Sequence, residues 1–104
     1  MEPIQVIGIN VLDDKEQEAA NTLINGYYEK IARELKNVTS VSVHLKAHSK
    51  GGKKKYDIRI KALAPTRVFE SQESDWDLAR TLHKVFKNVE RQIQHKLHTD
   101  EQKL

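Results

Sequence analysis

The last third of the chain alternates between apolar and polar residues with the period of an α-helix. At about 100° per residue, one face of the segment 78–98 is apolar and carries Leu78, Leu82, Val85, Phe86, Val89 and Ile93. The opposite face contains no acidic residue and carries Arg80, Lys84, Lys87, Arg91 and His95. The pattern predicts a helix with one buried face and one face of purely positive charge.

Four segments have the composition of β-strands. Residues 4–11 are rich in β-branched side chains, and Gly8 among them indicates a bulge or a close approach of another backbone. From Val38 onwards apolar and polar residues alternate with period two, which predicts two half-buried strands joined by a hairpin turn at 49–53. After a break at a proline, residues 67–71 predict a short fourth strand.

Helix signals follow the first strand and the last one. Residues able to form a capping box precede the first helix: Asp13 or Asp14 as the cap, with Glu16 or Gln17 behind it. Helical spacing of apolar residues extends this helix to about Leu35, and Gly26 within it suggests that another element approaches closely. Ser74 or Asp75 is the expected cap of the final helix.

These elements predict an α+β fold of order βαβββα in one domain spanning 1–104, with a loop at 37–39 and a frayed tail at 99–104. Each helix has one apolar stripe, so the economical packing places both on one face of a four-stranded sheet and leaves the other face exposed. Tyr27, Tyr56 and Phe86 lie in apolar stripes and should be core residues. Trp76 is expected to fasten the start of the last helix to the fourth strand.

Composition excludes several classes of protein. The 104 residues contain no cysteine, which removes disulfides, thiolate metal sites and thiol nucleophiles and suits a reducing cytosol. No secretory leader is recognisable, and no apolar run approaches the roughly 18 residues that a membrane span requires. We therefore expect a cytoplasmic protein that does not enter membranes.

Charge is distributed unevenly along the chain. The net charge is only +3, yet the first 18 residues hold five acids against one base, whereas residues 44–61 hold seven bases against one acid. The final helix adds five lysines and arginines against Glu90. Such a dipolar surface is typical of a protein that docks on phosphate in a fixed orientation.

Residues that could perform catalysis or bind a metal do not form a recognisable set. The acid pairs at 13–14 and 75–77 stand at helix starts, where acids serve as caps. His44 and His48 lie four residues apart on a strand, about 13 Å, which is too far to share one metal ion. No phosphate-binding glycine loop or dinucleotide motif is present. We predict no enzyme activity, cofactor, metal or small-molecule substrate.

The basic residues instead point to a nucleic acid. A charged outer face is ordinary for an amphipathic helix, but such faces usually mix signs, because Glu and Lys four residues apart stabilise each other. The cationic face of the last helix forms a ridge about 22 Å long, enough to meet several phosphates. The lysines around the glycine turn, Lys50, Lys53, Lys54 and Lys55, form either a solvated tip or a flexible finger that reaches a nucleic acid backbone. The exposed sheet face lacks paired aromatics, so base-specific recognition is not expected.

The chain resembles the ribosome hibernation-promoting factor family in its short form. Residues 7–11 are similar to the first strand of that family, and the segment 75–79 is similar to the acidic and aromatic opening of its last helix. The resemblance implies a non-enzymatic factor that occupies the tRNA and mRNA sites of the small ribosomal subunit without pairing ribosomes. It also implies that basic residues of the last helix face ribosomal RNA, Lys96 included.

The expected interface combines the ridge, the first helix and the hairpin, in a protein that is monomeric when free. The expected rRNA-binding residues are Arg80, Lys84, Lys87, Arg91, His95, Lys96, Lys30, Arg33, Lys53, Lys54 and Lys55. The alternative is a double-stranded-RNA-binding module, whose αβββα layout would need the first strand as an addition. Its last helix begins with lysines, whereas residues 74–77 here are acidic.

Overall fold

The chain follows the predicted order of strands and helices, which confirms the α+β fold class. The structure is a computed structural model that describes residues 4–35, 38 and 40–102, so most of the loop expected at 37–39 lies outside the described residues. Its elements are β1 (Ile4–Ile7), a 3₁₀ turn η1 (Ile9–Val11), α1 (Asp14–Glu34), β2 (Ser40–Lys50), β3 (Lys53–Ala64), β4 (Arg67–Asp75) and α2 (Leu78–Gln102).

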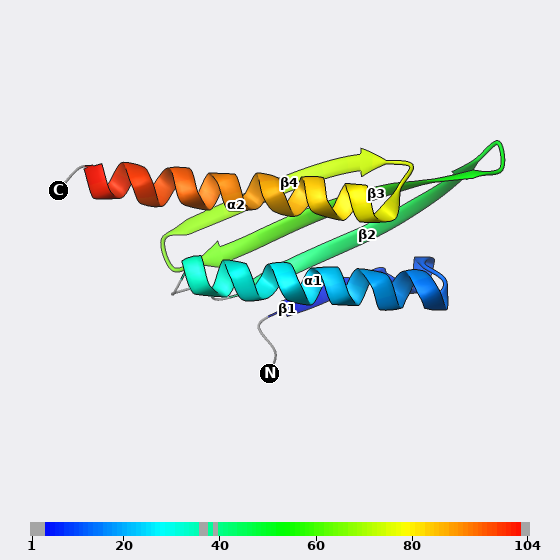
Figure 1. Ribbon diagram of the computed structural model, residues 1–104, viewed down its shortest axis with the longest axis horizontal. Helices are drawn as coiled ribbons and strands as arrows, with labels where there is room; N and C mark the ends of the chain where they lie inside the picture. The colour runs from blue at the N-terminus through cyan, green and yellow to red at the C-terminus, as the bar shows by residue number, and fades with distance from the viewer. Residues whose placement is uncertain (1–3, 36–37, 39, 103–104) are drawn as a thin grey trace.

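The four strands form one mixed sheet in the order β1-β2-β3-β4. Strand β1 runs parallel to β2, and β2, β3 and β4 are antiparallel neighbours (Figure 1). Strands β2 and β3 meet in a tight turn at Gly51 and Gly52, whose φ angles of 58° and 78° favour glycine. Since α1 and α2 both begin near this turn, the helices run in the same direction across the sheet (Figure 1).

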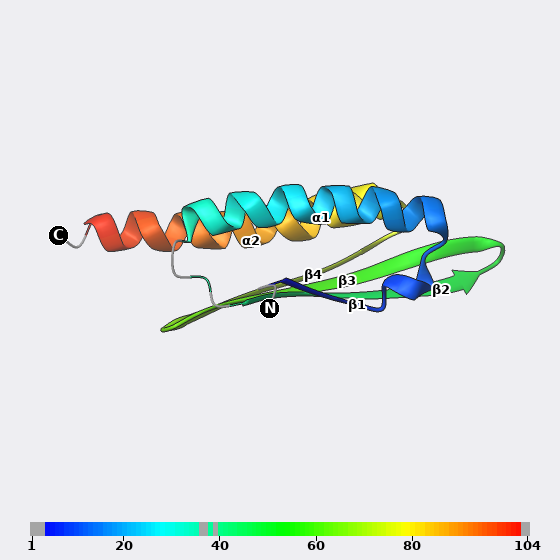
Figure 2. The same cartoon turned by 90° about the horizontal axis from the view of Figure 1, so that it is seen from below.

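Both helices cover the same face of the sheet, and the other face carries no helix (Figure 2). Alternate residues of β2 and β3 are buried beneath them, among them Val43 and Ile60, which are neighbours across the strands. Phe86 is fully buried, and Tyr27 and Tyr56 are buried as expected. The core therefore lies in a single layer between the sheet and the helix pair.

The first helix begins with the expected capping box. The Asp13 carboxylate accepts the Glu16 backbone N–H at 2.8 Å, and the Glu16 carboxylate accepts the Asp13 N–H at 3.0 Å. The expected cap of α2 was wrong: Asp77, not Ser74 or Asp75, accepts the backbone N–H of Arg80 at 2.9 Å. The cap moves because β4 continues to Asp75 before the chain turns into the helix.

Three boundaries differ from the sequence-based expectation. Strand β1 ends at Ile7 rather than at residue 11, because the chain leaves the sheet at Gly8 and forms η1. Strand β4 runs to Asp75 rather than to residue 71, because its polar second half pairs with β3. The tail expected at 99–104 is helical to Gln102 and lies outside the described residues beyond that point.

The glycines at 8 and 26 have opposite roles. Gly8 has a φ of 86°, and a Cβ there would lie 2.2 Å from the Leu45 carbonyl oxygen, which confirms the expected close approach of another backbone. The same expectation for Gly26 was wrong, because nothing lies within 4 Å of the position that its Cβ would take. Gly8 is therefore fixed by tertiary contact, whereas Gly26 only weakens an exposed stretch of helix.

We predict that Gly8→Ala and Gly26→Ala change stability in opposite directions. Alanine at position 8 should lower the free energy of unfolding by at least about 2 kcal/mol, because it combines left-handed backbone with a clash. Alanine at position 26 should raise it by up to about 1 kcal/mol through better helix propensity. Urea unfolding of both variants checks this, and a shift of the same sign in both would contradict the assignment.

Candidate nucleic acid interface

The cationic face of α2 forms a continuous ridge on the outside of the molecule. Its five members are exposed and lie on the side of the helix opposite Leu82, Phe86 and Val89, which are buried. The ridge consists of Arg80, Lys84, Lys87, Arg91 and His95, and we call it the α2 ridge. At 1.5 Å per residue it extends over about 22 Å.

A carboxylate from the sheet engages the first half of the α2 ridge. Asp75, at the end of β4, accepts a hydrogen bond from the Lys84 amine at 2.8 Å and lies 3.9 Å from the Arg80 guanidinium. Its side chain is only 14% exposed. The hydrogen bond from Lys84, together with the backbone N–H of Trp76, lowers the pKa of Asp75, so the carboxylate is charged. Part of the positive charge expected here is therefore already compensated.

Two neighbouring cations of the α2 ridge are left uncompensated. Among the described residues, the side chains of Lys87 and Arg91 have no ion-pair or hydrogen-bond partner. Both are exposed and four residues apart, so they lie one above the other on consecutive turns. This pair of cations is the part of the α2 ridge most available to an external anion.

Lys96 does not belong to the α2 ridge. It follows Arg91 by five residues, which places it about 140° around the helix, toward the side that carries the buried residues. It is nevertheless exposed. The C-terminal end of α2 projects beyond the end of the sheet (Figure 2). A ligand lying along the α2 ridge would not meet Lys96 on the same face.

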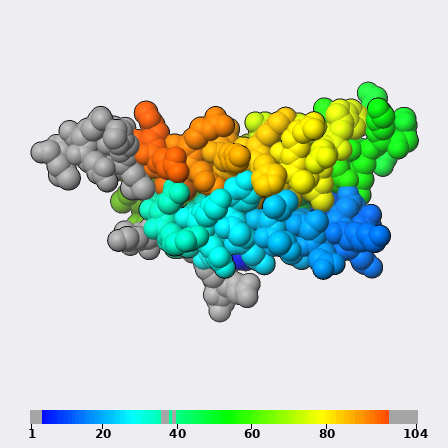
Figure 3. Space-filling view, in the orientation of Figure 1, coloured from blue at the N-terminus to red at the C-terminus, as the bar shows by residue number. Residues whose placement is uncertain are grey.

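The first helix contributes two exposed cations, Lys30 and Arg33. The Lys30 amine lies over the ring of Tyr27, 5.3 Å from its centroid, and Tyr27 stacks on Phe86 of α2 at 4.8 Å. The Tyr27 hydroxyl also shares a hydrogen bond with His83. Burial of the Tyr27 hydroxyl, and the negative charge of Glu90, raise the pKa of Tyr27. Lys30 therefore lies at the junction of the two helices, which run side by side over this face (Figure 3).

The three hairpin lysines have different environments, so they do not form one finger. Lys54 donates to the Glu16 carboxylate at 3.1 Å and to the Val11 carbonyl at 2.9 Å, which ties the turn end of the hairpin to the start of α1. Lys55 places its amine over the ring of Trp76. Lys53, like Lys50 on the other side of the glycine turn, is an exposed lysine at the end of the hairpin.

Glu16 is the centre of this attachment. Besides Asp13 and Lys54, its carboxylate accepts a hydrogen bond from the Tyr56 hydroxyl. Although burial opposes the charge, the hydrogen bonds from Tyr56, Asp13 and Lys54 hold the pKa of Glu16 below its ordinary value. Burial and the same carboxylate raise the pKa of Tyr56 to about 12. The acidic start of α1 is therefore partly used to anchor the basic hairpin.

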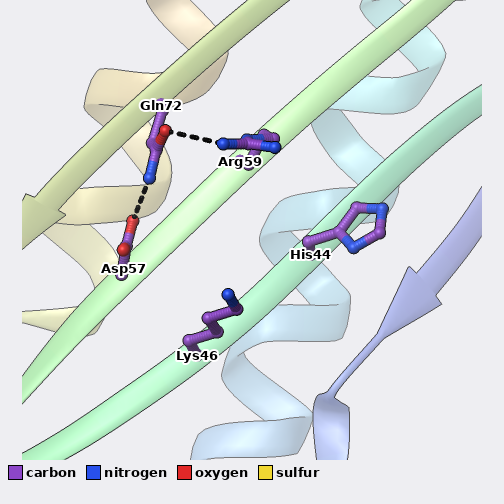
Figure 4. Close-up of a pocket in the computed structure, with 5 residues that line it drawn as sticks. All are labelled: His44, Lys46, Asp57, Arg59 and Gln72. Atoms are coloured by element: carbon purple, nitrogen blue, oxygen red, sulfur yellow. Dashed lines mark hydrogen bonds between the residues drawn. The ribbon is translucent and has the colours of Figure 1, made fainter.

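The uncovered sheet face carries a hollow lined by charged and polar side chains (Figure 4): His44, Lys46, Asp57, Arg59 and Gln72. Gln72 donates to Asp57 at 3.0 Å and accepts from Arg59 at 3.2 Å. Further along, Lys61 lies 3.7 Å from Glu70. This face is thus less positive than its lysines and arginines suggested, because Glu70 of β4 lies beside Lys61 and Gln72 links Arg59 to Asp57.

Two further observations concern the described part of the chain. No group of three or more His, Asp or Glu side chains there is arranged to hold a metal ion. No helix there is long and apolar enough to cross a membrane.

Residues 4–99 match the protein family described as Sigma 54 modulation protein / S30EA ribosomal protein. The chain belongs to this family. Its members are non-enzymatic, ribosome-associated factors of translation inhibition and hibernation, which confirms the resemblance noted in the sequence. No curated protein matches the sequence significantly.

Solved structures with the same fold support the architecture. A ribosomal subunit interface protein from Coxiella burnetii aligns over 91% of this chain and 94% of its own, with a TM-score of 0.66 and 14% identity. The N-terminal domain of Protein Y from Thermus thermophilus aligns over 88% of this chain and 92% of its own, with a TM-score of 0.55 and 14% identity. At this level of identity the likeness concerns the fold.

The double-stranded-RNA-binding alternative receives no support from the family or the fold. Strand β1 pairs in register with β2 over its whole length, and the family match begins at residue 4, so the first strand is an integral part of the domain. At the start of α2, Asp75 and Asp77 are both held in place, where a lysine cluster would be needed to grip a duplex.

The Glu16 attachment predicts a pH-dependent loss of stability. A lowered pKa means that Glu16 stabilises the fold above the ordinary value of 4.5 and that this contribution disappears as the pH falls through the lowered pKa. Glu16→Gln should therefore be less stable than the parent chain at pH 6.5, and the difference should shrink as the pH falls below 4.5. Urea midpoints measured from pH 6.5 downward test this, with Glu18→Gln on the same helix as the control. A constant difference would contradict the role of the charge.

Proposed function

We propose that this protein binds ribosomal RNA of the small subunit in the cytoplasm and inhibits translation by occupying the tRNA and mRNA sites. The observation that carries the proposal is the uncompensated pair Lys87 and Arg91 at the centre of an exposed cationic ridge. Membership of a family of ribosome-associated factors supports the ribosome as the source of the RNA. The name of the Coxiella burnetii protein points to the subunit interface.

The geometry suits contact with phosphates rather than chemistry on a substrate. A helix packed on a sheet holds the Cα atoms of these cations in a fixed row, so little backbone order must be gained on binding. Release of counterions from RNA then supplies much of the affinity, independently of base sequence. Lys30 and Arg33 on α1 extend the positive surface sideways from the α2 ridge.

Inhibition in this proposal follows from occupancy alone. The domain is elongated, with extents of 54 × 28 × 18 Å. Its two helices lie on one face of the sheet (Figure 2), and the exposed α2 ridge is on the side of α2 away from the core. A body of this size seated on the small subunit excludes other ligands from the same RNA surface. The protein acts as a monomer, because one copy supplies the whole α2 ridge.

Charge reversal of the uncompensated pair tests the proposal directly. Lys87→Glu with Arg91→Glu should abolish cosedimentation with small subunits at moderate salt, with an unchanged circular dichroism spectrum. The neutral pair Lys87→Gln with Arg91→Gln should reduce the slope of log affinity against log salt by about 2.

The matched control reverses two lysines of the sheet face, Lys46→Glu with Lys61→Glu, which changes the net charge equally. This variant should still cosediment with small subunits. Release by both double variants, or by neither, would refute the α2 ridge as the interface.

Asp75 should act as an internal competitor for the RNA. Asp75→Asn removes the carboxylate that holds Lys84 and Arg80 but keeps an oxygen able to accept the Trp76 backbone N–H. We expect a several-fold gain in affinity for small subunits at low salt, which fades at high salt because it is electrostatic. Filter binding at two salt concentrations measures this. Unchanged affinity at both would show that this half of the α2 ridge does not face the RNA.

A further inference from the structure

One aromatic side chain is not used by the core. Trp76 is 49% exposed, whereas Tyr27, Tyr56, Phe69 and Phe86 are buried. The expected role of Trp76, fastening α2 to β4, is therefore wrong. The ring instead contacts the hairpin, where the Lys55 amine lies 5.6 Å from its centroid. A half-exposed indole beside a cation leaves part of the ring accessible to a ligand that can stack on it.

Trp76 is the last member of a row that crosses the sheet. His48 and Lys55 are direct partners in the β2–β3 register, and Trp76 follows Asp75, the partner of Tyr56 on β3. Because Tyr56 and Asp75 point toward the helices, the neighbouring Lys55 and Trp76 point to the uncovered face. His48, Lys55 and Trp76 are all exposed, and we call them the hairpin row.

The hairpin row differs from the rest of the uncovered face in its charge. Asp57 and Glu70 offset Arg59 and Lys61 further along the sheet, directly or through Gln72. In the part of the chain that the structure describes, no carboxylate pairs with Lys53 or Lys55. The hairpin row and the adjacent tip therefore combine uncompensated positive charge with an accessible aromatic ring.

We propose that the hairpin row binds an unpaired nucleotide of RNA, with its base stacked on Trp76 and its phosphates on Lys55 and Lys53. Every base has a π-face, so a single tryptophan beside lysines binds unpaired nucleotides without choosing a sequence. In a duplex the bases are paired and stacked on each other, so no base is free to stack on Trp76. The inference rests on the proposed function in taking RNA as the ligand, but it uses residues outside the α2 ridge.

The hairpin row is positioned to bind a single-stranded segment that continues from RNA bound on the α2 ridge. Asp75 contacts Arg80, the first residue of the ridge, and accepts the backbone N–H of Trp76 at 2.6 Å. The start of α2 and the hairpin lie together at one end of the molecule (Figure 3). An RNA strand could therefore pass from the ridge around this end to Trp76.

The sole tryptophan of the chain makes the test direct, because its fluorescence reports only on this position. Single-stranded eight-nucleotide oligouridine and oligoadenosine should quench the emission of the full-length protein in a saturable manner. A blunt RNA duplex of the same length should quench it far less. Equal quenching by the duplex, or none by the single strands, overturns the proposal.

Variants separate stacking from general attraction. Binding of a labelled oligoadenosine, followed by anisotropy, should weaken by about 5- to 150-fold in Trp76→Ala and much less in Trp76→Phe, which keeps an aromatic face. Lys55→Gln should weaken binding more than Lys61→Gln, which removes the same charge from the same face about 20 Å away along β3. Parent-like affinity of Trp76→Ala overturns the stacking role.

The Lys87→Glu, Arg91→Glu variant distinguishes the two proposals. It retains Trp76, so oligonucleotide quenching should persist even though ribosome binding is lost. If that variant still binds small subunits while the single strands quench, the α2 ridge proposal fails and the stacking site stands. If it releases the ribosome while no oligonucleotide quenches Trp76, the α2 ridge proposal stands and the stacking site fails.

Discussion

Burial of one sheet face beneath two helices that run in the same direction is the constraint on which the rest of this structure depends. Strands β2 and β3 supply alternating apolar residues to that face, and each helix has a single apolar stripe to cover them. Phe86 of α2 lies at the centre, stacked on Tyr27 of α1. Once these stripes face inward, the cations of α2 must face outward, so the packing of the core also orients the proposed interface.

Charge compensation then decides which cations remain available. Carboxylates that are distant in the sequence offset several of the basic residues: Asp75 engages Lys84, Glu16 engages Lys54, and Glu70 lies beside Lys61. The net charge of the protein is only +3. Among the described residues, no ion pair compensates Lys87 and Arg91 on the α2 ridge or Lys53 and Lys55 on the hairpin. A protein of modest net charge can therefore present two strongly positive patches.

The hairpin is a supported arm rather than a loose loop. Contacts of Lys54 and Tyr56 with Glu16 fasten it close to the turn, and its two strands pair up to Lys50 and Lys53 on either side of the turn. Between the alternatives of solvated tip and flexible finger, the contacts favour a paired arm that is held to α1 near its exposed tip. Because the hairpin is already ordered, an RNA ligand would lose less free energy to ordering its backbone on binding.

The sequence by itself determined the order of elements, the buried face of each helix, the capping box of α1 and the position of the α2 ridge, because the periods of 3.6 and 2 are local properties of the backbone. Helical angle alone could also have separated Lys96 from the ridge. Only the tertiary structure decided that the polar residues 72–75 extend β4, that Lys84 and Lys54 are neutralised, and that Trp76 stays exposed. Each of these depends on strand pairing or on contacts between residues 9 to 38 positions apart, which no local pattern records.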